Sequence, residues 1–228
     1  MNYLAHGYRF LDTPLFAAGT AVPDWLSVAD RSVRVRSRRI DAVYAQLTQE
    51  SRELAAGIRQ HLADDDRFHR SETFLMLESE LGVLFRRRMP DPFDHRPGFL
   101  GHIVTELMLD AILAERDPNL LPRYYAAIQE VCPRSVQETV NQIAPRTTDR
   151  LSGFIEAFLQ TQFLYDYLQD GLLLTRLNQV LRRVKLPVME DDCLTVLSHA
   201  RQLLRKHGDA LLQSVETGIS PSERELDP

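Results

Sequence analysis

The chain has 228 residues, 44% of them hydrophobic, and a formal net charge of -5. This composition is typical of a globular protein with a core and argues against disorder, while the near balance of basic and acidic residues gives no nucleic-acid or polybasic membrane signature. Two cysteines, Cys132 and Cys193, lie far apart without a CxxC partner, which argues against a zinc ribbon or a disulfide framework. We interpret both cysteines as packing residues in a protein of a reducing compartment.

The N-terminus has no basic region followed by an apolar run, and no stretch of about 18 apolar residues occurs in the chain. We therefore expect neither a signal peptide nor a membrane span, and predict a soluble, cytoplasmic protein.

The first segment is short and mostly apolar, and it contains His6. Such a histidine is either a buried side chain with a backbone partner or a ligand. Residues 15–25 are mostly apolar as well, with Gly19, Pro23 and Asp24 interrupting them. Asp24 either caps the N-terminus of a helix, as aspartate often does, or points into a site.

Five arginines fall within the nine residues 31–39. They form either a solvated surface or a docking patch for an acidic or phosphorylated partner, since the guanidinium group pairs well with carboxylates and phosphates. The residues we assign to this docking patch are Arg34, Arg36, Arg38 and Arg39.

The spacing of apolar residues predicts a helix over 40–65 and another from Ser71 to the basic stop at 86–88. Gly57 in the first helix is unfavourable by about 1 kcal/mol relative to alanine unless a close approach or a kink requires it. After a loop at 91–98, further helices are predicted over 99–116, 120–131, 134–144, 148–169, 171–185 and 190–215.

No alternating strand pattern persists for more than a few residues. We therefore predict an all-α fold, a single-domain helical bundle over residues 1–216. The polar residues 217–228 have no periodicity, and we expect a disordered C-terminal tail there.

Two triplets of potential metal ligands have the same spacing, i, i+4 and i+8. They are His61, Asp65 and His69 in one predicted helix and His102, Glu106 and Asp110 in another. This spacing places each triplet on nearly one helical face, and two such faces opposed in a bundle would form a pocket of nitrogen and oxygen ligands. The alternative is that these polar residues are simply solvated.

Four segments, in the same order, resemble the motifs of bacterial acyl carrier protein phosphodiesterases. They are residues 1–6 (MNYLAH), 19–25 (GTAVPDW), 56–65 (AGIRQHLADD) and 103–113 (IVTELMLDAIL). The resemblance implies a helical, HD-domain-like fold related to the metal-dependent phosphohydrolases. It also implies release of 4′-phosphopantetheine from holo-acyl carrier protein, typically with Mn²⁺; Fe²⁺, Zn²⁺ and Mg²⁺ are alternatives.

The resemblance carries site residues over by position, and the two stripes add His69 and His102. The resulting metal set is His6, Asp24, His61, Asp65, His69, His102, Glu106 and Asp110, and the candidate catalytic residues are Asp65, His102 and Glu106. The chain departs from the family at Glu106, where aspartate is usual, and at Ala111, where histidine is usual. These departures affect the substrate more than the fold.

Three functions remain open from the sequence. The first is a phosphodiesterase acting on holo-acyl carrier protein. The second is an HD-like hydrolase of another small phosphoester. The third is a helical binding protein without catalytic activity.

Overall fold

The structure is a computed structural model that describes residues 1–88 and 96–216. Within these residues every regular element is an α-helix or a 3-10 helix, so the all-α prediction is confirmed. The chain divides into two compact units. Unit 1 comprises Met1, Asp65–Arg116 and Asp166–Pro228, and unit 2 comprises Asn2–Asp64 and Asp117–Tyr165.

Each unit is built from separate chain segments, so the units do not follow one another as consecutive domains. The predicted tail at 217–228 lies outside the described residues, and the predicted boundary at residue 216 and the HD-like detail of the fold stay predictions.

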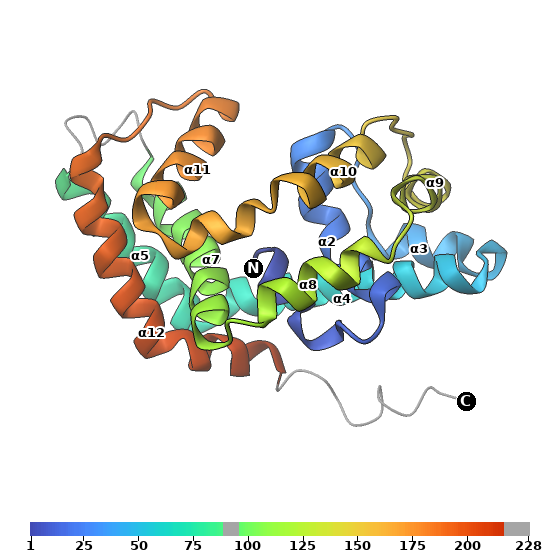
Figure 1. Cartoon of the computed structure of the whole chain (residues 1–228), viewed down its shortest axis with the longest axis horizontal. Coiled ribbons are helices and arrows are strands. Elements are labelled where there is room, and N and C mark those ends of the chain that lie inside the picture. Colours follow the sequence, from blue (N-terminus) through green and yellow to red (C-terminus); the bar gives the residue numbers. More distant parts are fainter. Residues whose placement is uncertain (89–95, 217–228) are drawn as a thin grey trace. The chain divides into compact units, whose positions relative to one another are not determined.

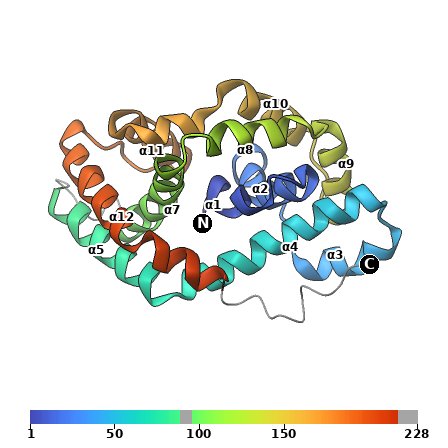
Figure 2. The ribbon, with the colours of Figure 1, turned by 60° about the horizontal axis from the view of Figure 1, so that its bottom comes forward.

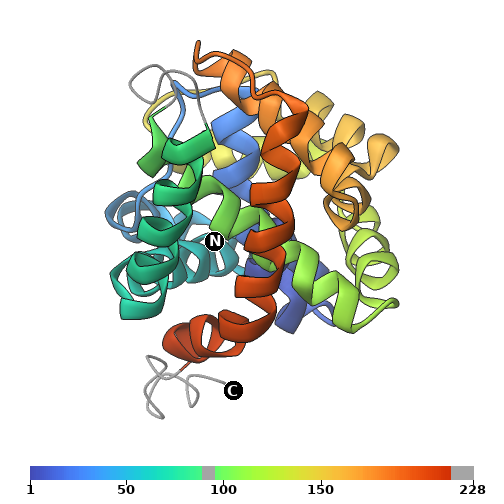
Figure 3. The ribbon, with the colours of Figure 1, turned by 90° about the vertical axis from the view of Figure 1, so that its left-hand side faces the viewer.

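Unit 1 is organised around one pair of helices. Its elements are the end of α4 (Gln49–Arg70), α5 (Glu72–Arg88), α7 (Pro97–Arg116), α11 (Asp170–Arg183), the 3-10 helix η4 (Asp191–Cys193) and α12 (Leu194–Glu216). Helix α5 packs most extensively against α7, and α12 contacts both of them (Figures 1 and 3).

Glycines allow α5 and α7 to approach each other at the level of the backbone. A Cβ atom on Gly101 would lie 2.2 Å from the carbonyl oxygen of Glu78 and 2.9 Å from the backbone nitrogen of Gly82. A side chain at position 101 would therefore push the two helices apart. This close crossing fixes the position of the next residue, His102, along α5.

Unit 2 contains the remaining helices and the beginning of α4. They are α1 (Tyr3–Gly7), η1 (Tyr8–Phe10), α2 (Pro14–Ala29), α3 (Ser37–Val43), η2 (Tyr44–Gln46), α8 (Leu120–Gln129), α9 (Pro133–Ile143), α10 (Leu151–Thr161) and the start of η3 (Phe163–Leu168). Helix α1 contacts α2 and α8 (Figure 2), and α10 packs on α9 and α2. The fully buried Trp25, Tyr124 and Phe158 fill its core.

A second glycine crossing joins α2 to α4 in unit 2. A Cβ atom on Gly57 would lie 2.1 Å from the carbonyl oxygen of Phe16, and one on Gly19 would lie 2.2 Å from that of Leu54. The expectation that a close approach requires Gly57 is confirmed.

Three predictions from the sequence are corrected. The predicted helix 40–65 is interrupted, because Leu47 has an extended backbone and Thr48 Oγ1 accepts a hydrogen bond from Ser51 N at the start of α4. The predicted helix 148–169 ends at Thr161, since Gln162 adopts a left-handed conformation with φ 44°. Asp24 lies inside α2, so it does not cap a helix.

The two cysteines differ in environment. Cys193 is buried, as predicted for a packing residue, but Cys132 is exposed, so the packing interpretation of Cys132 is wrong.

Among the described residues, α7 is the one helix that is long and apolar enough to cross a membrane, and 72% of that window is buried inside the structure. Buried core helices of soluble proteins have the same composition, so the structure is consistent with a soluble protein. A cytoplasmic location stays a prediction.

Candidate metal centre

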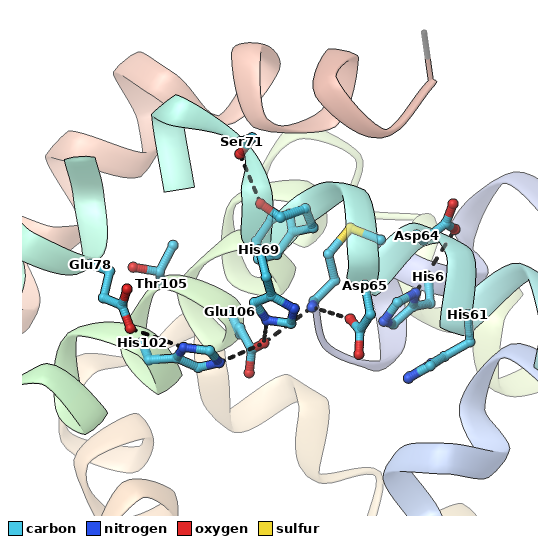
Figure 4. Close-up of polar contacts among 12 residues, drawn as sticks. His6, His61, Asp64, Asp65, His69, Ser71, Glu78, His102, Thr105 and Glu106 are labelled. Carbon is cyan, nitrogen blue, oxygen red and sulfur yellow. Dashed lines mark hydrogen bonds and ion pairs between the residues drawn. The ribbon is translucent and has the colours of Figure 1, made fainter. Parts of the chain in front are cut away.

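Two imidazole rings and one carboxylate converge in unit 1 (Figure 4). His69, near the end of α4, places Nε2 2.9 Å from Oε1 of Glu106, and His102 places Nε2 3.4 Å from the same oxygen. We name His69, His102 and Glu106 the unit 1 cluster. One ligand atom from each residue lies within 4.8 Å of the other two. The two predicted triplets therefore do meet: His69 of the first contacts His102 and Glu106 of the second.

The turn between α4 and α5 sets the position of His69. Ser71 caps the start of α5, where a helix was predicted to begin, because its Oγ accepts a hydrogen bond from Phe74 N and donates one to Phe68 O. Phe74 is buried, and its ring meets the His69 and His102 rings edge-on at centroid distances of 4.9 and 5.0 Å. One aromatic ring thus contacts both imidazoles, which are stacked on each other with their centroids 4.8 Å apart.

Glu78 lies beside the unit 1 cluster and belongs to neither predicted triplet. Its Oε1 lies 3.0 Å from His102 Nδ1, on the opposite side of the ring from Glu106. Histidines that bind metals usually donate their second ring nitrogen to a carboxylate or a carbonyl, which fixes the ring and makes it a better ligand. The glycines at the α5–α7 crossing, Gly82 and Gly101, are the sequence signal that could have pointed to this pairing.

The charges of the unit 1 cluster depend on one another. Burial raises the pKa of Glu106, but the Met1 ammonium and the hydrogen bonds from His102 and His69 lower it more, so this carboxyl group stays ionised well below its usual range. The hydrogen bond to Glu106, opposed by burial and assisted by Glu78, raises the pKa of His102. The Met1 ammonium lies 3.1 Å from Glu106 and 2.8 Å from Asp65, so these carboxylates already attract a cation.

The unit 1 cluster fits a metal ion. When two neighbouring ligand atoms bind the same ion at about 2.1 Å, they lie roughly 3.0 Å apart in octahedral geometry and 3.4 Å apart in tetrahedral geometry. The two distances from Glu106 Oε1 to the imidazole nitrogens are 2.9 and 3.4 Å. Two histidines and one carboxylate are also the ligand set of open catalytic sites for zinc and iron.

A second group of histidines lies in unit 2. The rings of His6 and His61 are stacked with their centroids 3.8 Å apart, and both side chains are buried. His61 Nδ1 donates to the carbonyl oxygen of Thr20 at 2.7 Å. The Gly19–Gly57 crossing brings that carbonyl within reach, and the hydrogen bond leaves His61 Nε2 as the nitrogen with a lone pair, which is the arrangement of a metal ligand.

Asp64 is the buried carboxylate of this second group, and it belongs to neither predicted triplet. Its carboxylate accepts hydrogen bonds from Arg9 Nη2 at 3.3 Å and from Gln60 Nε2 at 2.7 Å, and its Oδ2 lies 3.9 Å from His6 Nδ1. We name His6, His61 and Asp64 the unit 2 group. A guanidinium thus lies within hydrogen-bond distance of this carboxylate.

The other predicted ligands are distributed between the units. Asp65 is half-buried in unit 1, Asp110 is buried in α7 of the same unit, and Asp24 is half-buried in α2 of unit 2. The predicted convergence of His6 and His61 with the 102–110 stripe involves both units and stays a prediction.

Comparisons with protein-family models, with curated proteins and with solved structures find no significant match to this chain.

Proposed function

We propose that the chain is a metal-dependent phosphodiesterase and that His69, His102 and Glu106 are metal ligands in it. One observation carries the proposal: a single oxygen of Glu106 faces Nε2 of two imidazoles, one of which is fixed from behind by Glu78. An ordinary solvated surface has no requirement for this arrangement.

A bound divalent ion supplies Lewis-acid chemistry, because it lowers the pKa of water and neutralises charge on phosphate oxygens. In the proposed reaction Asp65 accepts the proton of the attacking water, because it is a partly exposed carboxylate close to Glu106: both lie within 3.1 Å of the Met1 nitrogen. The oxygen–phosphorus bond to the leaving alcohol then breaks, and the alcohol takes up a proton.

The substrate and the metal follow from the resemblance to acyl carrier protein phosphodiesterases, and both are proposals. We propose Mn²⁺ as the ion and holo-acyl carrier protein as the substrate, with another small phosphoester as the alternative. His6, Asp24, His61 and Asp110 are proposed as further ligands on the same ground.

The test uses protein purified without chelators. We expect bound metal by elemental analysis and hydrolysis of bis(p-nitrophenyl) phosphate that chelator abolishes and Mn²⁺ restores. In Glu106→Gln both metal content and hydrolysis are expected to fall at least about tenfold. Glu80→Gln, on the exposed side of α5, removes one carboxylate of the same kind and is the matched control.

Two results would redirect the proposal. Hydrolysis of the small diester without action on holo-acyl carrier protein would favour the small phosphoester. Unmodified protein that binds neither Mn²⁺, Zn²⁺ nor Fe²⁺ and cleaves neither substrate would replace the enzyme with a helical binding protein.

A further inference from the structure

An arginine-lined cavity of about 260 Å³ lies in unit 2, away from the histidine groups in the sequence. Its lining residues are Arg31, Ser32, Arg34, Arg36, Arg38, Arg39, Pro145 and Arg146. Six guanidinium groups therefore surround one cavity, and none of its described lining residues is acidic. We name it the arginine pocket.

The local backbone explains why these arginines point outward together. Val33 and Val35 are buried, with 1% and 7% of their surface exposed, whereas Arg34 and Arg36 are exposed. This alternation has the period of an extended chain, in which successive side chains point to opposite sides. The two valines anchor the segment in the core, and Arg34 and Arg36 point to solvent.

Hydrogen bonds hold both walls of the arginine pocket. Asp30 accepts bonds from the backbone nitrogen and the hydroxyl of Ser32, at 3.1 and 2.7 Å, which closes the turn that leads into the segment. Arg39 Nε donates to the carbonyl oxygen of Ile143 at 3.4 Å and so joins the segment to the end of α9. The loop after α9 is fastened in turn by the paired bonds between Asn141 and Thr148.

Within residues 1–88 and 96–216, carboxylates do not pair with the exposed arginines of the 34–39 segment that line the arginine pocket. Over the residues that the structure describes, no ion pair joins Arg34, Arg36, Arg38, Arg39 or Arg146 to a carboxylate. Arginine stays protonated at every physiological pH, so these groups repel one another. An anion that entered the pocket would remove this repulsion as well as form new hydrogen bonds.

We propose that the arginine pocket binds a compact anion that carries two or more phosphate groups. Arginine donates paired N–H groups that match the oxygens of a phosphate, and several of them can bind adjacent phosphates at once. A cavity of this size lies just below the range of pockets for drug-sized ligands, so it suits a small molecule better than an extended protein surface. The proposal does not depend on the metal centre.

The test is calorimetric titration of the full chain with inorganic pyrophosphate and tripolyphosphate in 0.15 M salt. Arg36→Gln/Arg38→Gln removes two exposed guanidinium groups of the pocket, and Arg123→Gln removes an exposed one from α8 in the same unit. We expect pyrophosphate to bind at one site and the double variant to lose at least about tenfold in affinity, while Arg123→Gln stays within twofold. Because the arginines repel one another, the thermal midpoint of the ligand-free double variant should equal or exceed that of the unmodified chain.

Further variants separate a built site from diffuse charge attraction. Arg36→Lys/Arg38→Lys keeps the charge but loses the paired donors, so several-fold weaker binding is expected. Lysine variants that bind as tightly as the unmodified chain, or equal losses in Arg123→Gln, would contradict the proposal. Absence of pyrophosphate binding, together with binding of an acidic acyl carrier protein that the double glutamine variant loses, would replace it with protein docking.

Discussion

Glu106 in unit 1 and Asp64 in unit 2 are both carboxylates that face imidazole rings, yet their remaining partners differ. Two histidines and the Met1 ammonium approach Oε1 of Glu106, whereas Asp64 is bound by Arg9 and Gln60. A guanidinium gives a carboxylate a permanent counter-charge, while an imidazole can lose its proton and offer a lone pair. The partners of each carboxylate thus indicate its role. Asp64, which pairs with a guanidinium, stabilises the fold, whereas Glu106, which faces imidazoles, can take part in metal binding.

The largest expected effect concerns stability in unit 2. Asp64 has no exposed surface and pairs with Arg9, so Asp64→Ala removes one charge of a buried ion pair and should lower the free energy of unfolding by about 3 kcal/mol. Urea unfolding measures this loss. Asp66→Ala, which removes an exposed carboxylate paired with Arg70, is the control and should cost less than about 1 kcal/mol. Equal losses of unfolding free energy in the two variants would contradict a structural role for Asp64.

At Glu106 we expect the main effect on metal affinity rather than on stability. Glu106→Gln is expected to weaken binding of Mn²⁺ or Zn²⁺ by more than about 100-fold, because loss of a direct ligand should exceed the 10–100-fold effect of outer partners. Calorimetry or a chelator competition assay measures the change. Because the carboxylate is an acceptor for neighbouring cations, the apo protein is also measured by urea unfolding, which separates lost affinity from lost folding. Unchanged affinity in a folded variant would exclude Glu106 as a ligand.

A smaller effect is expected at Glu78. Glu78→Gln keeps a hydrogen-bond acceptor for His102 Nδ1 but removes the charge, so metal affinity should fall about 10-fold and at most about 100-fold. Glu80→Gln should leave affinity unchanged. A loss as large as that of Glu106→Gln would indicate that Glu78 is itself a ligand.

The two cysteines provide a pH-dependent comparison of the units. Hydrogen-bond donors of Ser135 and of the Arg134 backbone lower the pKa of exposed Cys132, whereas burial, followed by the charge of Asp192, raises the pKa of Cys193 to about 11. Iodoacetamide at pH 8 should therefore label Cys132 at least about 10-fold faster than Cys193 in the folded chain. Peptide mass spectrometry measures both rates, and urea should abolish the difference.

The same shift affects stability. The pKa of Cys193 is higher in the folded chain than the ordinary value of 9.0. The contribution of the neutral thiol to the free energy of unfolding is therefore fully present below pH 9 and is lost as the pH rises through about 11. Cys193→Ala should weaken this alkaline decline in the free energy of unfolding. A decline of the same size in both proteins would assign it to other groups.

Spacing was enough to predict the long helices from α4 onward, but not α2, and it selected three residues of the two triplets that do face one another. The i, i+4 and i+8 rule needs only local geometry, and His69, His102 and Glu106 indeed share one cluster. Helix ends were less predictable, since the break at Leu47 and the left-handed Gln162 carry no glycine or proline.

Glu78 and Arg9 could not be selected from the sequence. Glu78 contacts the unit 1 cluster across a helix crossing, and Arg9 contacts Asp64 from a segment distant in the chain; such contacts are set by packing rather than by spacing. Glycine pairs were the nearest signal, because Gly19–Gly57 and Gly82–Gly101 mark the crossings that place His61 and His102.

The measurement that tests the metal centre most directly is an anomalous difference map from crystals soaked in Mn²⁺. We expect a peak about 2.0–2.3 Å from His69 Nε2, His102 Nε2 and a carboxylate oxygen of Glu106. Crystals that show no peak at these three atoms at millimolar Mn²⁺ and at millimolar Zn²⁺ would contradict the account.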